Sequence, residues 1–308
     1  MRAFTDSRCL DHPAPAGFPE RPERVAGVVA ALENLAGCEV VRGAGAPGLE
    51  AAIVAVHDAR YVERFARAVE RGDGVIDTAD NPIGRASFAA ASAAVEASLA
   101  ALDDALAGGS RRAFAAVRPP GHHAERDRAM GFCLFNNAAI AAQRALDRHG
   151  LERVAILDFD VHHGNGTQHL FEERGDVFYA SVHQWPFYPG TGAAGERGRG
   201  AGEGATLNVP LPAGSGDAEY EQAFTERLLP ALDAFAPELL IVSAGFDAWQ
   251  QDPLGGMRVT EAGFARWGER LRDLAERRCG GRALSLLEGG YDLGALPSLV
   301  CSYLGYML

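Results

Sequence analysis

Residues 154–165 read VAILDFDVHHGN, a short apolar run followed at once by acidic and histidine side chains. An apolar run of this length is typical of a strand buried on both faces of a parallel sheet. Four similar runs, each bounded by turn-forming residues, occupy 113–117, 177–180, 239–243 and 283–287. Helical patterns separate the runs, and the clearest lie at 22–35, 58–69, 87–106 and 260–277. The alternation predicts an α/β fold, a wound and mainly parallel sheet with helices on both faces.

The helix boundaries carry recognisable signals. Pro22 falls in a first turn, and Asp58 and Thr260 stand where N-caps are expected. The apolar C-terminal segment 293–308 is interpreted as a core helix. Since no repeat period and no low-complexity linker interrupts the pattern, we expect residues 1–308 to form a single domain.

Composition excludes several classes of protein. The 308 residues carry 29 basic and 41 acidic side chains, a net charge of −12, so direct binding of nucleic acid is not expected. No lysine occurs, which excludes a Schiff-base lysine and a P-loop lysine. Five scattered cysteines without a CxxC pair favour a reducing, cytoplasmic location. Neither a signal peptide nor a membrane span is expected.

The longest irregular stretch is 184–207, which contains seven glycines between 190 and 204. A loop of this length is either functional or a flexible surface insertion. The segment 185–189, WPFYP, favours a functional loop because its aromatic and proline residues are too apolar and stiff for a solvated linker.

Polar side chains follow four of the predicted strands. In a wound parallel sheet, ligands bind beyond the carboxyl ends of the strands, so these residues are the candidates for chemistry. The segments are RPPGHH at 118–123, DFDVHHGNG at 158–166, AGFD at 244–247 and EGGY at 288–291. We therefore expect histidines, carboxylates and one tyrosine to meet at one rim of the sheet.

The second of these segments indicates a metal site. On an extended chain, side chains alternate, so Asp158, Asp160 and His162 share one face while Phe159 and Val161 pack on the other. Nitrogen and carboxylate ligands without thiolate suit Zn²⁺ or Fe²⁺, and three protein ligands with an open position mark a catalytic metal. Asp247, at a neighbouring strand end, is the candidate third ligand beside Asp160 and His162.

Any one of these residues alone has an ordinary structural explanation. A single strand-end aspartate is more often a helix cap, and a lone histidine is more often a hydrogen-bonded core residue. Together they are harder to explain structurally, because burying two His-His pairs and three aspartates is costly without a function.

Taken in order, these motifs resemble those of the histone deacetylase superfamily, the zinc-dependent amidohydrolases that include acetylpolyamine amidohydrolases and bacterial deacetylase-like proteins. The matching segments, in chain order, are FPERPER at 18–24, VHD at 56–58, RPPGHHA at 118–124, GFC at 131–133, NN at 136–137, the metal segment, FYPGTG at 187–192, NVPL at 208–211, SAGFD at 243–247 and EGGY at 288–291. Asn165, where class I members have aspartate, and Glu288 are similar to the class II branch.

The resemblance implies roles for the rim residues. Asp160, His162 and Asp247 would be the zinc ligands. His123 would be the general base and later the acid, with Asn165 as its partner, and a neutral Asn165 should raise its basicity less than a carboxylate would. The same likeness implies that Asp158 holds His122, which supplies electrostatic stabilisation, and that Tyr291 donates to the oxyanion.

The resemblance also implies a substrate channel and bound potassium. Phe132 and Tyr188 would be its aromatic walls, the Gly131 carbonyl would accept from the substrate amide, and Asp80 would be a rim aspartate. Potassium would bind at an inner site near Asp158, Asp160, His162, Ser181 and Val182, and at an outer site near Phe171, Arg174 and Val177.

The expected substrate is an N-acylated primary amine. Polyamine-selective relatives can carry a glutamate seven residues after the last zinc ligand, and here that residue is Leu254. This favours an acyl-lysine side chain over an acetylpolyamine, although the net charge of −12 would attract either cation.

Two alternatives are an arginase-like ureohydrolase and a non-catalytic acyl-amine sensor. The first would need additional strand-end aspartates, whereas residues 243–247 supply one carboxylate. The second would be favoured by loss of Tyr291 or of a histidine, and all of these are present. Nothing in the sequence specifies an oligomeric state or a macromolecular partner.

Overall fold

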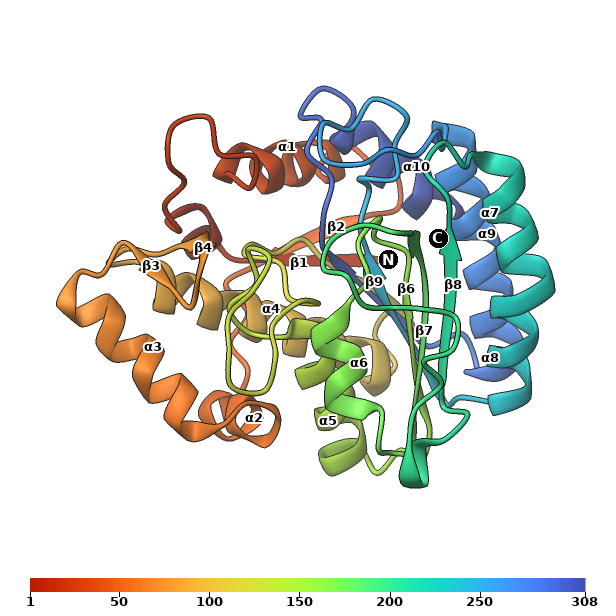
Figure 1. The fold of residues 1–308 in the computed structure, drawn as a ribbon, viewed down its shortest axis with the longest axis horizontal. Helices are drawn as coiled ribbons and strands as arrows, with labels where there is room; N and C mark the ends of the chain where they lie inside the picture. The colour runs from red at the N-terminus through yellow and green to blue at the C-terminus, as the bar shows by residue number, and fades with distance from the viewer. Residues whose placement is uncertain (308) are drawn as a thin grey trace.

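A computed structural model describes residues 1–307 and contains one large sheet with helices on both of its faces (Figure 1). The eight strands are all parallel and lie in the order β2-β1-β5-β10-β9-β6-β7-β8. Their bounds are β1 Arg2–Thr5, β2 Glu39–Arg42, β5 Arg112–Ala115, β6 Val154–Asp158, β7 Val177–Gln184, β8 Thr206–Leu211, β9 Leu239–Ala244 and β10 Ala283–Leu287. The predicted α/β fold class is confirmed.

Two layers of helices cover the sheet. One layer contains α2 Leu49–Val56, α3 Ala59–Arg71, α4 Ser87–Ala107, α5 Asn137–His149 and α6 Asn165–Phe171. The other contains α1 Pro22–Leu32, α7 Asp217–Ala223, the π-helical turn Phe224–Leu228, α8 Leu229–Phe235, α9 Glu261–Arg278 and α10 Leu296–Met307. No helix among residues 1–307 combines the length and apolar character needed to cross a bilayer.

The predicted helix boundaries agree with the structure to within a few residues. The Asp58 side chain accepts from the N–H of Arg60, and that of Thr260 accepts from the N–H of Gly263, so both act as N-caps. The first helix ends at Leu32 instead of residue 35 because the chain turns through Leu35 toward β2. The predicted C-terminal core helix is α10.

Strands β1 and β2 and helix α5 are absent from the sequence prediction. Strand β2 lies at an edge of the sheet and carries polar, partly exposed residues at both of its ends, so it lacks the apolar run of a central strand. Strand β8 begins inside the stretch predicted as irregular, which leaves 185–205 as the actual loop.

A small antiparallel pair, β3 Val75–Ile76 and β4 Thr78–Pro82, lies outside the main sheet and carries Asp80. The buried His57, at the end of α2, accounts for the motif at 56–58. Its Nε2 accepts from the N–H of Asn136 (2.9 Å), and its Nδ1 therefore donates to the carbonyl of Glu125 (2.9 Å). Burial lowers the pKa of His57 to about 4, as these two bonds with the neutral ring require.

We predict that the stability difference between the wild type and His57→Gln decreases as pH falls from 6.5 to 4. Below pH 6.5 the unfolded chain binds a proton at this histidine and the folded chain does not, so protonation favours the unfolded state. The extra free energy of unfolding of the wild type relative to His57→Gln should decrease by up to about 3 kcal/mol, at about 1.4 kcal/mol per pH unit. Urea unfolding of both proteins at several pH values measures the difference in their free energies of unfolding. A difference that does not change with pH would contradict the assignment of His57 as neutral.

Candidate active site

Four adjacent strands deliver the candidate residues to one rim. Strands β5, β10, β9 and β6 are consecutive in the sheet, and each is followed by one of the polar segments predicted from the sequence. Their carboxyl ends therefore lie side by side, which brings together residues separated by up to 169 positions in the chain, from His122 to Tyr291. Phe159 and Val161 pack in the core while Asp158 and Asp160 are buried at the rim, in agreement with the predicted alternation.

The three predicted metal ligands converge on a single point. Nδ1 of His162 lies 3.1 Å from Oδ1 of Asp160 and 3.2 Å from Oδ2 of Asp247. One ligand atom from each residue lies within 4.8 Å of those of the other two. The set offers one nitrogen and two carboxylate oxygens, which suits Zn²⁺ or Fe²⁺.

The charges of Asp160, His162 and Asp247 favour the binding of a cation. Asp160 and Asp247 are at most 1% exposed, and apart from its ionic contact with His162, Oδ2 of Asp247 makes no hydrogen bond. Burial, followed by the charge of Asp160, raises the pKa of Asp247 to about 7. Burial alone would lower the pKa of His162, but its two carboxylate neighbours raise it to about 10. Without a metal, the triad thus retains a proton in the place where a divalent cation fits.

Two glycines leave room for these carboxylates. A Cβ at Gly245 would lie 2.1 Å from Oδ2 of Asp160, and one at Gly289 would lie 2.1 Å from Oδ2 of Asp247 and 2.5 Å from Oδ2 of Asp160. Such distances are far below van der Waals contact. The residue type at both positions is therefore dictated by the ligand side chains and not by backbone conformation.

The paired histidines have different partners. Nδ1 of His122 lies 3.0 Å from Oδ2 of Asp158, whereas Nδ1 of His123 lies 2.7 Å from Oδ1 of Asn165. Against the effect of burial, Asp158 and then Asp160 raise the pKa of His122 to about 10. Burial, and then the charge of His122, hold the pKa of His123 well below its usual value. His122 is thus a cation beside a neutral His123.

Tyr291 is held from two sides. Its N–H donates to Oδ2 of Asp252 (2.6 Å), and the guanidinium of Arg24 lies 4.7 Å from the centre of its ring. Arg24 also donates to the carbonyls of Glu288 and Gly290, which fixes the turn that carries the tyrosine. Burial raises the pKa of Tyr291 well above 10, so its hydroxyl remains a hydrogen-bond donor.

The predicted channel residues line one cavity of about 240 Å³ that reaches His123 and His162. Its lining consists of Asp80, His123, Gly131, Phe132, His162, Phe187, Tyr188, Leu254 and Tyr291. At its mouth, Oδ2 of Asp80 accepts from the N–H of Gly131 and the hydroxyl of Tyr188, both at 3.2 Å. The hydroxyl that distinguishes Tyr188 from phenylalanine therefore joins two sides of the channel.

Sequence reasoning missed Phe187 and the role of Glu288. The ring of Phe187 stacks on His162 with a centroid distance of 5.3 Å, and the sequence pointed to it only through the WPFYP and FYPGTG segments, without a role. Oε2 of Glu288 accepts from the N–H groups of Gly121 (2.7 Å) and His122 (3.2 Å). This buried carboxylate therefore holds the loop that carries both histidines.

The residues predicted for potassium fall into two places. Asp158 and Ser181 are direct partners in the β6–β7 ladder, next to the metal triad. Phe171 ends α6, Val177 begins β7, and the guanidinium of Arg174 lies 5.3 Å from the ring of Phe171. The first group is compact and adjacent to the rim, and both potassium sites stay predictions.

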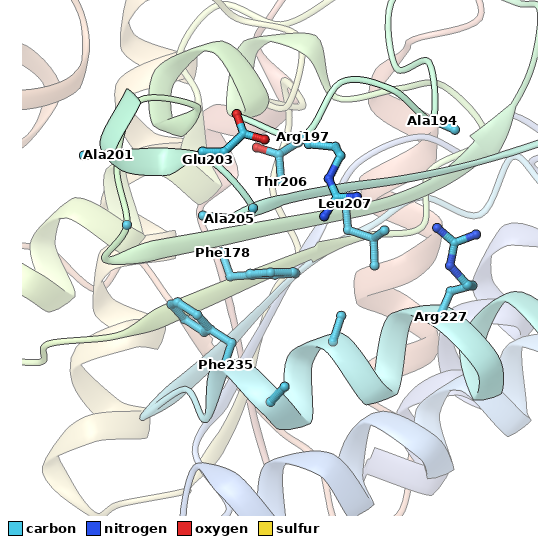
Figure 2. A pocket seen from close by; sticks show the side chains of 14 residues that line it. Phe178, Ala194, Arg197, Ala201, Glu203, Ala205, Thr206, Leu207, Arg227 and Phe235 are labelled. Atoms are coloured by element: carbon cyan, nitrogen blue, oxygen red, sulfur yellow. The ribbon is translucent and has the colours of Figure 1, made fainter. Parts of the chain in front are cut away.

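A larger cavity of about 610 Å³ lies between α8 and the glycine-rich part of the 185–205 loop. Figure 2 shows that its lining includes Phe178 and Phe235, whose rings lie next to each other, and the exposed Arg197 and Arg227. None of the predicted catalytic or metal residues lines it. The candidate chemistry is therefore confined to the smaller channel.

We predict that Gly289→Ala weakens zinc binding about 10–100-fold, the range typical for residues that orient metal ligands. The added methyl group would displace both carboxylates. Gly294→Ala is the matched control, because its nearest contact, Oδ1 of Asp292, would be at an ordinary 3.4 Å. Competition with a fluorescent chelator measures affinity, and equal affinities for the two variants would contradict the triad as the zinc site.

Comparisons with known proteins identify the family of the chain. The sequence model of the histone deacetylase domain matches residues 18–307. The chain is 52% identical over 187 residues to histone deacetylase 10, chloroplastic, from Oryza sativa subsp. japonica, a match that covers 61% of this chain and 42% of the rice protein. It is 42% identical over 295 residues to a histone deacetylase-like amidohydrolase from Pseudomonas aeruginosa, covering 92% of this chain and 75% of that protein.

A crystal structure of acetylpolyamine aminohydrolase from Burkholderia pseudomallei superimposes with a TM-score of 0.89 at 34% identity. The superposition covers 100% of this chain and 98% of that chain. The sequence match and the superposition thus both extend over almost the full length described. The chain belongs to the histone deacetylase domain family.

Proposed function

We propose that this protein is a zinc-dependent deacetylase that hydrolyses the amide of an N-acylated primary amine, with an acyl-lysine side chain as the favoured substrate. The observation that carries the proposal is the cavity lined by His123, His162 and Tyr291, in which His162 converges with the buried carboxylates of Asp160 and Asp247. Family membership supports the same chemistry.

Asp160, His162 and Asp247 would hold the metal. Zinc bound there would supply Lewis acidity toward the amide carbonyl and lower the pKa of water. Three observations support this assignment: the three ligand atoms converge, Oδ2 of Asp247 lacks a hydrogen bond, and Gly245 and Gly289 leave space for the carboxylates.

The remaining residues of the rim would transfer protons and stabilise the developing negative charge. Neutral His123 takes a proton from the attacking water, and it later returns a proton to the amine nitrogen as the C–N bond breaks. Tyr291, which keeps its proton, and cationic His122 stabilise the negative charge that develops on the carbonyl oxygen. The products are a carboxylate and a free amine.

The channel favours a linear aliphatic amine. Phe132, Phe187 and Tyr188 form aromatic walls, and the cavity is lined by Leu254 where a glutamate gatekeeper would face a secondary ammonium. An acetylpolyamine is the second candidate substrate, since the carboxylate of Asp80 stands at the mouth and the overall charge is −12. A sensor without turnover is the remaining alternative.

Two further proposals concern the cellular location of the protein and a structural ion. All five cysteines are free, which supports a reducing location such as the cytoplasm. We also propose potassium at the inner site beside Asp158 and Ser181 as a structural ion.

We predict that Tyr291→Phe lowers kcat about 10²–10³-fold, the loss typical for one oxyanion donor, with bound zinc unchanged. Tyr306→Phe, a change in a tyrosine that is 49% exposed, is the matched control and should retain wild-type kcat. Turnover with zinc content measured on the same samples tests this. A near-wild-type rate in Tyr291→Phe would contradict the assigned role.

The substrate class is tested with acetyl-lysine peptide, acetylputrescine and acetylspermidine, using zinc-loaded and chelated enzyme in parallel. We expect peptide turnover that is lost on chelation. Polyamine preference would retain the reaction but refute the argument from Leu254. Absence of turnover on all three with zinc bound would favour the sensor.

A further inference from the structure

A chain of hydrogen bonds leads from His123 to the surface. Oδ1 of Asn165 lies 2.7 Å from Nδ1 of His123, and Nδ2 of Asn165 donates to Oε1 of Glu125 at 2.5 Å. Oε1 and Oε2 of Glu125 lie 2.8 and 3.1 Å from Nδ1 of His169. His123 and Asn165 are buried, whereas the side chain of His169 is 40% exposed.

Glu125 is the nearest acceptor to Nδ2 of Asn165, at 2.5 Å, whereas the carbonyl of His123 and Sδ of Met130 both lie at 3.5 Å. An amide presents an acceptor on one side and a donor on the other, so it could offer either to His123. A carboxylate can only accept. With Glu125 at Nδ2, the oxygen of Asn165 must face Nδ1 of His123, and Nδ1 must then carry the proton.

The orientation of the amide therefore sets the tautomer of His123. A neutral imidazole protonated at Nδ1 has its lone pair on Nε2, and His123 lines the channel. A reversed amide would stabilise the opposite tautomer, which cannot accept a proton at Nε2. In a serine protease, exchanging the buried aspartate for asparagine lowers kcat by about 10⁴ through this kind of error.

Charge reaches the two histidines by different routes. Asp158 pairs directly with His122, whereas Glu125 acts on His123 through an intervening neutral amide. Successive hydrogen bonds polarise one another, so the carboxylate makes Oδ1 of Asn165 a better acceptor without placing a full charge on His123. This route leaves His123 neutral beside the cationic His122.

We propose that Glu125 is a positioning residue for His123, which it orients and polarises through Asn165. The inference rests on the proposed function of His123 as the base. The backbone of Glu125 is itself fixed, since its carbonyl accepts from Nδ1 of His57 and its N–H donates to the carbonyl of Arg128 (both 2.9 Å). Nδ1 of His169 contacts both oxygens of the carboxylate, including the Oε1 that accepts from Asn165.

The proposal is tested by exchanging the two side chains. Glu125→Gln removes the obligate acceptor, and Asn165→Asp places two carboxylates against each other. Each should lower kcat about 10–100-fold with little change in KM or bound zinc. In the double variant, the glutamine amide donates to the aspartate, which accepts directly from His123, so kcat should rise above both single variants.

Recovery in the double variant would show coupling that general structural damage does not produce. Losses that simply multiply, or full kcat in Glu125→Gln, would overturn the proposal. Glu173→Gln is the matched control, because Glu173 is an exposed carboxylate just beyond α6 that pairs only with Arg199 among residues 1–307. It should retain wild-type kcat.

A second measurement does not depend on turnover. ¹⁵N NMR of histidine-labelled protein should show His123 protonated at Nδ1 in the wild type and a mixture of tautomers in Glu125→Gln. Protonation at Nε2 in the wild type would overturn the proposal. An inactive wild type with the expected tautomer would refute the deacetylase function while leaving the positioning role intact.

Discussion

The rim is organised around the repulsion between two buried carboxylates, Asp160 and Asp247. The parallel order of β9 and β6 forces them together out of contact with water, where like charges are costly. Backbone N–H groups compensate part of the cost of burying these two charges. The N–H of Gly289 donates to Asp160 (2.8 Å), and the N–H of Val161 donates to Asp247 (2.9 Å). His162 contacts both carboxylates, and a bound cation would compensate the remaining charge.

A cluster of buried ion pairs stabilises the loops that follow β5 and β10. Glu20 accepts from both Arg24 (3.0 Å) and Arg118 (2.9 Å), and all three are at most 1% exposed. Arg24 holds the turn after β10, while Arg118 lies on the loop after β5 and donates to the carbonyl of His12 (2.6 Å). Residues far from the chemistry in sequence thus fix two of the four strand ends. This accounts for the motif at 18–24, which contributes no ligand of its own.

The central strands and the rim were predictable because two general regularities apply to them. Doubly buried strands are continuous apolar runs, and the carboxyl ends of parallel strands share an edge. The edge strand β2 follows neither regularity, since its ends are polar and partly exposed. Phe187 and Tyr188 differ in orientation over the candidate site, one stacked on His162 and the other edge-on to His123, and sequence does not encode that geometry. Glu125 escaped prediction because its partner Asn165 is 40 residues away.

The two adjacent histidines show how one residue type can be given two protonation states. Their rings are 4.0 Å apart, so both cannot be cations at once without strong repulsion. A carboxylate in direct contact selects His122 as the cation, and that charge in turn disfavours a second proton on His123. The asparagine at position 165 is therefore not a weakened copy of an aspartate. A neutral acceptor there adds no negative charge that would favour a second proton on His123. In our proposal, the more distant carboxylate of Glu125 supplies the orientation that an amide alone does not have.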